Sequence, residues 1–280
     1  DLHRYCARMT GSIADGEDVV QDALARAYYE LSELKELPVM RSWLFRIAHN
    51  RALDYLGRYE RRMSEPLEVA VDIAGDDVDP ESALARNEAV DAAVSRFLEL
   101  APAQRSCVIL KDVLGYSLEE IAALLGLTTP AVKAALHRGR VRLHELSASP
   151  DPLASPRAVS PAVARYAALL NARDWDGVRE MLVDDVKLDL VSRWKCAGRR
   201  EVSDYFTNYD SISDWHLVPG WLDGRETLAV FRDPRNPRPD YFVELTLADG
   251  RIVAIRDFRY VPYVALEARF NRARPEASLP

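Results

Sequence analysis

Basic side chains recur through a short stretch near the middle of the chain. Between Thr128 and His144 there is no acidic residue, whereas lysine, arginine and histidine occur every few positions. Ammonium and guanidinium groups neutralise phosphates, and both also donate to the guanine acceptors in the major groove of DNA. The residues with this chemistry are Lys133, His137, Arg138, Arg140 and Arg142. The stretch therefore predicts a contact with nucleic acid.

Two helices joined by a short turn have to position these side chains. The stretch from Ser117 to Leu143 begins with a serine that is followed three residues later by Glu120, the pattern of a capping box. Gly126 then ends the first helix, and Pro130 stands where the first turn of a second helix tolerates proline. This order is typical of the helix-turn-helix that enters the major groove. The alternative is an ordinary helical hairpin with a basic face toward solvent.

A second basic stretch lies closer to the N-terminus. Six arginines occur between Arg41 and Arg62, against only Asp54 and Glu60. Helical periodicity predicts a helix over 42–56, with aromatic residues interleaved among the arginines. Rings that stack on bases and arginines that follow phosphates suit single-stranded DNA, and the alternative is that the rings are simply core. The aromatic residues are Trp43, Phe45, Tyr55 and Tyr59.

The total charge does not by itself indicate a nucleic-acid partner. The 280-residue chain has a formal net charge of −7, but nine acidic residues gather between Ser64 and Asp91, where Arg86 is the single basic residue. The local electric field, rather than the total charge, steers a polyanion. The two basic stretches therefore still indicate a nucleic-acid contact. No run of 18 apolar residues exists, so we expect no membrane span.

The cysteines and the first residues bear on the compartment and on the ends of the chain. Cys6, Cys107 and Cys196 are odd in number and widely spaced, without a CxxC pair, which predicts reduced thiols in a cytoplasmic protein. No signal peptide is visible. The chain begins at Asp1 rather than Met, within a helical pattern, and we expect the native start to be missing.

Three stretches taken together resemble one bacterial family. They read DGEDVVQDALARAYYEL, SWLFRIAHNRALDYLGRYERR and LAPAQRSCVILKDVLGYSLEEIAALLGLTTPAVKAALHRGRVRL, in this order. Over about residues 1–146 the chain resembles RNA polymerase sigma factors of the extracytoplasmic-function group. The resemblance implies two all-α domains, a region-two helical bundle and a region four that contains the helix-turn-helix.

The resemblance also implies roles for residues at matching positions. The polymerase contact would comprise Asp18, Gln21 and Asp22. The surface for the melted downstream promoter element would comprise Arg46, Asn50, Arg51, Asp54, Arg58, Arg61 and Arg62. Lys133, His137 and Arg138 would face the groove of the upstream element. Arg140, Arg142 and Arg105 would meet phosphates, and the alternative for Arg105 is an arginine in solvent.

The pattern of the chain changes after a proline-rich stretch. Helices are predicted over 160–172, from Asp174, and over 199–209, with strands over 186–190, 215–222, 226–232, 241–247 and 252–260. With the phrase NARDWDGVREMLVDDVKLDL, this order resembles a SnoaL-like α+β cone, as found fused to some sigma factors of this group. A glycine-rich DGGGK-type motif of one such subgroup is absent, because the equivalent stretch reads VSRWKCAGRR.

The expected organisation is therefore multidomain. We expect region two over 1–63, an acidic linker over 64–82, region four over 83–148, a proline-rich linker over 149–160, the SnoaL-like domain over 161–270 and a tail over 271–280. Relatives of the cone use an acid in an apolar cavity, which makes Asp189, His216 and Asp257 candidates. The residues of a possible pocket are Asp189, Trp194, Tyr205, His216, Trp221, Tyr241 and Asp257.

The sequence and its resemblance together predict a cytoplasmic sigma factor that is not an enzyme. Its expected partners are core RNA polymerase and promoter DNA, with an intramolecular contact between the SnoaL-like domain and the sigma domains as built-in regulation. No cofactor, metal, catalytic residue or membrane contact is expected. The alternative is a ligand-sensing DNA-binding regulator, or an enzyme that acts through the pocket of the cone.

Overall fold

The chain forms two compact units, Asp1–Pro150 (unit 1) and Asp151–Pro280 (unit 2). The computed structural model describes residues 1–34, 36, 38–63, 89–90, 92–148, 157–212, 214–233 and 235–274, with the side chains of 59–63 and 208 left out. The predicted acidic linker 64–82 lies outside the described residues, as do residues 149–156 of the proline-rich linker and 275–280 of the tail.

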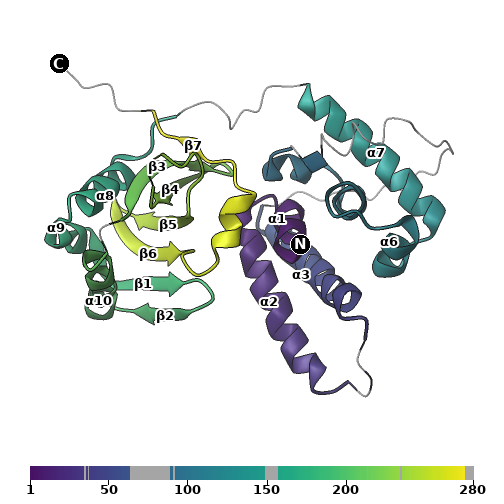
Figure 1. Ribbon diagram of the computed structural model, residues 1–280, viewed down its shortest axis with the longest axis horizontal. Helices are drawn as coiled ribbons and strands as arrows, with labels where there is room; N and C mark the ends of the chain where they lie inside the picture. Colours follow the sequence, from purple (N-terminus) through teal and green to yellow (C-terminus); the bar gives the residue numbers. More distant parts are fainter. Residues whose placement is uncertain are drawn as a thin grey trace. The chain divides into compact units, whose positions relative to one another are not determined.

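Unit 1 begins with three helices, α1 (Leu2–Thr10), α2 (Ile13–Leu31) and α3 (Met40–Met63) (Figure 1). Gly11 ends α1 in the left-handed conformation with φ 70°, and the side chain of Ser12 caps α2. Trp43 and Phe45 of α3 are buried in the core of the unit. The core interpretation therefore holds for these two aromatic residues.

The second half of unit 1 contains the predicted helix-turn-helix. It consists of η1 (Val94–Glu99), α5 (Pro102–Val108), η2 (Ile109–Val113), α6 (Leu118–Leu125) and α7 (Thr129–Ser147). Ser117 and Glu120 form the complete capping box at the start of α6, and Gly126 ends that helix with φ 68°. The element η2 is a π-helical turn, in which the amide of Leu114 donates to the carbonyl of Ile109 at 3.0 Å.

One hydrophobic core serves both halves of unit 1. Tyr5, Met9 and Phe45 from the first half belong to the same buried cluster as Cys107 and Leu136 from the second. Hydrogen bonds also connect the two halves. The Tyr5 hydroxyl donates to Ser106 Oγ at 3.2 Å, and it lies 2.7 Å from Nδ1 of His49 on α3. The two predicted sigma domains thus pack as a single body in this structure.

Unit 2 is the predicted α+β cone. The helices α8 (Pro161–Asn171), α9 (Trp175–Glu180) and α10 (Arg199–Asp210) lie along one side of a seven-stranded sheet (Figure 1). The strands, in the order β2-β1-β6-β5-β4-β3-β7, are β1 (Leu182–Leu190), β2 (Trp194–Ala197), β3 (His216–Leu222), β4 (Arg225–Phe231), β5 (Tyr241–Ala248), β6 (Arg251–Asp257) and β7 (Asn271–Arg272). Only β1 and β6 pair in parallel; the remaining pairs of the described sheet are antiparallel.

Two features of unit 2 differ from the sequence-based expectation. Strand β2 falls in a stretch for which no strand was predicted, and it pairs with β1. Residues 271 and 272, expected in the tail, form β7 and pair with β3 after the short helix η3 (Pro262–Leu266). The carbonyl of Pro219 also accepts from the amide of Ala273 at 3.0 Å, so the sheet continues past residue 270.

The described residues contain neither a membrane-spanning helix nor a cluster of metal-ligand side chains. None of the described helices is long and apolar enough to cross a membrane. In the same residues, no three histidine, cysteine, aspartate or glutamate side chains lie together as metal ligands would.

Candidate nucleic-acid interface and cavity

The helix α7 presents the predicted groove-facing residues to solvent. Lys133, His137 and Arg138 are exposed, whereas Val132 and Leu136 on the opposite side are buried in the core. The helix starts at Thr128, whose hydroxyl accepts from the amide of Ala131 at 3.3 Å. A rigid helix with a basic exposed face can be placed in a DNA groove without refolding.

Arg140 of the same helix holds α7 in place instead of facing outward. Its Nε donates to Asp112 Oδ2 at 2.9 Å, and its Nη2 donates to Oδ1 at 2.5 Å. The Asp112 side chain is 3% exposed and comes from the π-helical turn η2. This bidentate pair uses one edge of the guanidinium, whose side chain is 20% exposed, so Arg140 supports the packing of α7 and its phosphate contact stays a prediction.

Arg105 is enclosed within unit 1. Arg105 as a whole is 4% exposed. Its guanidinium donates to the carbonyls of Met9 at 2.5 Å, Leu98 at 3.1 Å and Leu100 at 2.9 Å. Neither the phosphate contact nor the solvent arginine describes this residue, which links α1 to the start of α5. Arg142, in contrast, is exposed and lies 3.2 Å from Glu145 and 3.6 Å from Glu99.

The helix α3 carries a polar stripe at four-residue spacing. Arg46, Asn50, Asp54 and Arg58 are exposed, and this spacing places them along one face. Arg51 is partly buried, and its Nη1 donates to Asp54 Oδ2 at 3.4 Å. The side chains of the remaining predicted members, Arg61 and Arg62, lie outside the described part of the structure.

The helix α2 exposes the residues predicted to contact polymerase. Asp18 and Asp22 are exposed, and Gln21 is partly buried, with Nε2 donating to Glu17 Oε1 at 2.6 Å. Further along the same helix, Tyr28 and Tyr29 are 76% and 71% exposed. Large exposed rings on a polar helix are typical of a binding surface.

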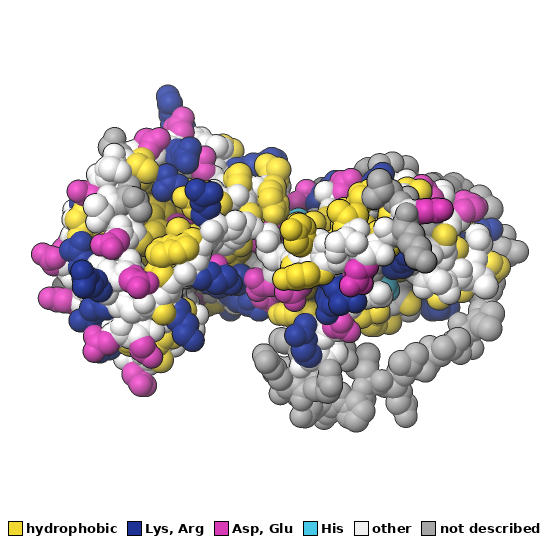
Figure 2. Space-filling view, turned by 90° about the horizontal axis from the view of Figure 1, so that it is seen from below, with side chains coloured by type: hydrophobic (Ala, Val, Ile, Leu, Met, Phe, Trp, Pro, Cys, Tyr) yellow, Lys and Arg dark blue, Asp and Glu magenta, His cyan; other side chains and the backbone are white. Residues whose placement is uncertain are grey.

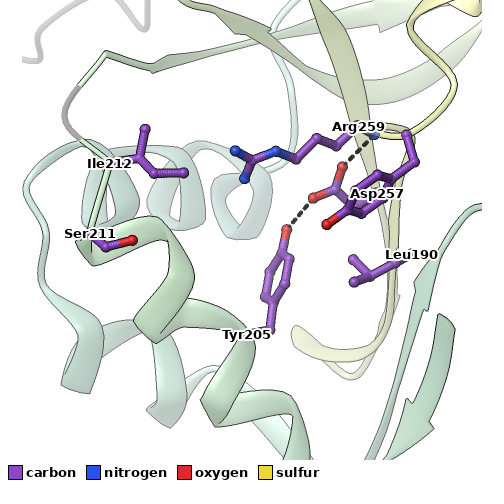
Figure 3. A pocket seen from close by; sticks show the side chains of 7 residues that line it. Leu190, Tyr205, Ser211, Ile212, Asp257 and Arg259 are labelled. Carbon is purple, nitrogen blue, oxygen red and sulfur yellow. Dashed lines mark hydrogen bonds between the residues drawn. The ribbon is translucent and has the colours of Figure 1, made fainter. Parts of the chain in front are cut away.

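Unit 2 contains a cavity of about 270 Å³ beside the ends of β1, α10 and β6 (Figure 3). Its lining residues are Leu190, Tyr205, Ser211, Ile212, Asp257, Arg259 and Tyr260. Asp257 is completely buried. Its Oδ2 accepts from the hydroxyls of Tyr205 at 2.7 Å and Tyr209 at 2.8 Å, and its Oδ1 accepts from the backbone amide of Arg259 at 2.8 Å.

The ionisable groups around Asp257 have shifted pKa values. Burial raises the pKa of Asp257 above its ordinary value, although the hydrogen bonds from the two tyrosines act in the opposite direction. Burial likewise raises the pKa of Tyr241 to about 12, with the charge of Asp257 acting in the same direction. Both tyrosine hydroxyls that contact Asp257 stay protonated and donate to it.

The predicted pocket is only partly the observed cavity. Tyr205 and Asp257 line it, and Tyr241 is one step removed, with its hydroxyl 3.0 Å from that of Tyr209. The remaining four predicted pocket residues do not line the cavity. Asp189 pairs with Lys195 at 2.9 Å, Trp194 and His216 are exposed, and Trp221 lies under the guanidinium of Arg157 at 3.7 Å.

Sequence reasoning missed Tyr209 and Arg259, although each had a positional signal. Tyr209 follows Tyr205 by one helical turn, so both rings lie on the same face of α10. Arg259 stands two residues after Asp257, just past the end of β6. Neither spacing indicates a cavity until the helix is known to pack against that end of the sheet.

Comparisons with known proteins agree with this description of unit 1. Residues 1–62 match the model of Sigma-70 region 2, and residues 92–143 match that of Sigma-70, region 4. The chain is 34% identical over 206 residues to the ECF RNA polymerase sigma factor SigG of Mycobacterium tuberculosis, a match that covers 65% of this chain and 56% of SigG. It is 30% identical over 152 residues to SigW of Bacillus subtilis, covering 51% of this chain and 81% of SigW.

The two matched regions, together with the helix-turn-helix, define the class of this protein: it is a sigma factor with regions two and four. The chain belongs to the extracytoplasmic-function (ECF) RNA polymerase sigma factors. Among solved structures, that of the Mycobacterium tuberculosis extracytoplasmic function sigma factor SigJ aligns over 91% of this chain and 91% of its own, with 23% identity and a TM-score of 0.36.

Proposed function

We propose that this chain joins core RNA polymerase, directs it to a two-part promoter and helps to open the DNA. The observation that carries the proposal is the exposed basic face of α7, held on the core of a family-matched region four by the Arg140–Asp112 pair. Lys133, His137 and Arg138 on that face would read the upstream promoter element in the major groove. Arg142 would neutralise a phosphate.

The stripe on α3 would act on the downstream element. Asn50 has an amide that pairs with a base edge, and Arg46 and Arg58 supply positive charge on either side of it. A base flipped out of the duplex and held at this stripe would lower the cost of opening the DNA. Arg51, Asp54, Arg61 and Arg62 would complete the surface.

The exposed carboxylates of α2 would contact polymerase. Asp18 and Asp22, with Gln21 between them in the sequence, form a short acidic face on α2. Acidic faces of this kind set the orientation and rate of association with a basic partner surface.

Unit 2 would act as a built-in regulator and not as an enzyme. Asp189 and His216, two of the three candidate acid or base residues, do not line the cavity, and the third is held by three hydrogen bonds. Figure 2 shows acidic and basic side chains interspersed on the presented face of unit 2, which suits a protein contact better than a polyanion. Attachment through a short segment gives unit 2 a high effective concentration near unit 1.

In vitro transcription with purified core polymerase tests the main proposal. Adding the full chain to core polymerase on genomic templates should produce promoter-dependent transcripts that core polymerase alone does not make. A chain that ends after Ala148 should show a changed transcript yield or polymerase affinity if unit 2 regulates unit 1. Absence of any promoter-dependent transcript contradicts the sigma function, and unchanged values after truncation contradict the regulatory role.

A further inference from the structure

The cavity of unit 2 has a cationic side and an apolar side. The guanidinium of Arg259 extends across the cavity toward Ile212 (Figure 3), and it lies 5.6 Å from the ring centre of Tyr209. Leu190 and Ile212, with the ring of Tyr260, supply the apolar lining. A small number of polar groups in an otherwise apolar concave site is the usual composition of a ligand pocket.

Arg259 is available to an incoming ligand. Among the described residues, its guanidinium has no hydrogen-bond or ion-pair partner, and the polar contact of this residue with Asp257 is made by its backbone amide. Asp257 does not provide that partner: its oxygens accept from the hydroxyls of Tyr205 and Tyr209 and from the backbone amide of Arg259, not from the guanidinium. A half-buried guanidinium that points into a cavity favours an anion, and its planar fork matches a carboxylate.

The size of the cavity limits the ligand. A volume of about 270 Å³ lies just below the range of roughly 300–1,000 Å³ that holds drug-sized ligands. The ligand must therefore be small, with a compact apolar body on the side of Leu190, Ile212 and Tyr260. Asp257 and the two tyrosines form a fixed polar wall whose hydrogen bonds are internal, so they shape the site without offering a second charge-paired anchor.

We propose that this cavity binds a small monocarboxylate, with the carboxylate on Arg259 and a compact apolar body against Leu190, Ile212 and Tyr260. The site lies within unit 2 and does not depend on the proposed promoter recognition. Binding by the full chain is measured in the absence of polymerase and DNA, so its failure would leave the sigma function untouched.

Titration of the full chain with benzoate, followed by ligand-observed NMR, tests the site. Benzamide has the same shape without the charge and serves as the matched ligand. Benzoate should bind saturably, and at least tenfold more tightly than benzamide. Absence of saturable benzoate binding, or equal affinity for the two compounds, overturns the proposal.

Variants locate the binding. Arg259→Gln should weaken benzoate binding at least tenfold, whereas Arg269→Gln, the same change at an exposed arginine of the same unit, should leave it unchanged. Ile212→Trp should also block binding, because the larger side chain fills the cavity while Arg259 stays in place. Unchanged affinity in Ile212→Trp or in a folded Arg259→Gln would show that benzoate binds elsewhere and would overturn the proposal.

Discussion

Arg105 and Arg142 carry the same charge in the same unit but have opposite surroundings. Arg105 is enclosed and donates to three backbone carbonyls, whereas Arg142 is exposed between two glutamates. Buried carbonyls that lose a charged donor retain their desolvation cost, whereas exposed ion pairs contribute little. The functional meaning of an arginine in this chain therefore depends on burial rather than on charge.

Replacing Arg105 should destabilise unit 1. Arg105→Met keeps much of the side-chain volume but leaves the carbonyls of Met9, Leu98 and Leu100 without their donor. We expect the free energy of unfolding to fall by about 2–4 kcal/mol. Arg142→Ala is the control and should cost less than about 1 kcal/mol. Urea unfolding followed by circular dichroism measures both, and equal effects would contradict the burial argument.

Arg138 should determine sequence preference at the upstream element. If its guanidinium pairs with guanine, Arg138→Ala should weaken binding to the preferred sequence by about 1–3 kcal/mol and relax the preference there. Polymerase holoenzyme binding to a series of promoter variants measures this. Arg165→Ala, an exposed arginine of α8, is the charge-matched control. An equal loss on every DNA sequence would instead make Arg138 a phosphate contact.

Asp257 should make the stability of unit 2 depend on pH. Burial raises its folded pKa above the unfolded value of about 3.9. The neighbouring charged and titratable groups are Tyr166 of α8, Tyr205 and Tyr209 of α10, Tyr241 of β5 and Arg259. A raised acid pKa gives stability that is fully present below the unfolded value and is lost as the pH rises through the folded value.

Asp257→Asn cannot ionise and so provides the comparison. The stability of the native protein relative to this variant should decrease from about pH 4 upward, until Asp257 is fully ionised. Urea unfolding at a series of pH values measures the difference. A difference that stays constant, or that grows in favour of the native protein with pH, would contradict the raised pKa.

At the residue scale, the sequence predicts exposure well where helical periodicity decides it. Lys133, His137 and Arg138 follow from the period of α7. Arg105 could not be assigned in this way, because its partners include the carbonyl of Met9, 96 positions away. Asp257 was predicted as a candidate acid, whereas its enclosure by Tyr205 and Tyr209 depends on how α10 packs against the sheet.

At the level of helices, two glycines give a test of packing. A Cβ atom at Gly139 of α7 would lie 2.7 Å from Val108 Cγ2 and 3.3 Å from the carbonyl oxygen of Gln104, so α7 and α5 approach closely there. At Gly57 of α3, no atom of the described residues lies within 4 Å of the added atom. The same substitution therefore meets a packed interface in one helix and open space in the other.

Alanine at these two positions should have opposite effects. Gly57→Ala should stabilise unit 1 by about 0.5–1 kcal/mol through helix propensity alone. Gly139→Ala gains the same propensity but should destabilise overall by about 1–2 kcal/mol, because overpacking forces α7 away from α5. Thermal and urea unfolding of the two variants measure the sign of each change. A stabilising Gly139→Ala would contradict the close approach.

The elements themselves were predicted with unequal success. The helix-turn-helix was predicted from local residues, because its capping box, glycine turn and first-turn proline lie next to each other in the sequence. Strand β2 was missed because it is four residues long and is defined by pairing with β1. The strand β7 likewise depends on a partner, β3, that lies about 50 residues earlier.

At the scale of the whole molecule, each unit encloses its own core. The buried cluster of unit 1 runs from Tyr5 to Leu143, and that of unit 2 runs from Val159 to Ile255, without a shared residue. The sequence already placed a break between them at the proline-rich stretch, because composition and periodicity both change there. The packing of regions two and four into one body was not predicted, because it depends on contacts between residues that precede the segment 64–82 and residues that follow it.

Each unit should fold without the other. Fragments 1–150 and 151–280 should each unfold cooperatively in urea, because each retains its own cluster of buried apolar residues. The fluorescence of Trp43, the single tryptophan in 1–150, reports on the first fragment. A fragment that lacks a cooperative transition would show that its core needs the other unit.

The π-helical turn η2 makes the packing of α7 sensitive to a single-residue deletion. A π-helical turn holds one more residue than an α-helical turn, so loss of Lys111 would let α5 continue as a regular α-helix. Asp112 lies inside this turn, so closing the turn would change the direction of its side chain relative to α5 and disturb its pair with Arg140. The five residues of Ile109–Val113 therefore determine where the carboxylate that holds Arg140 of α7 is placed.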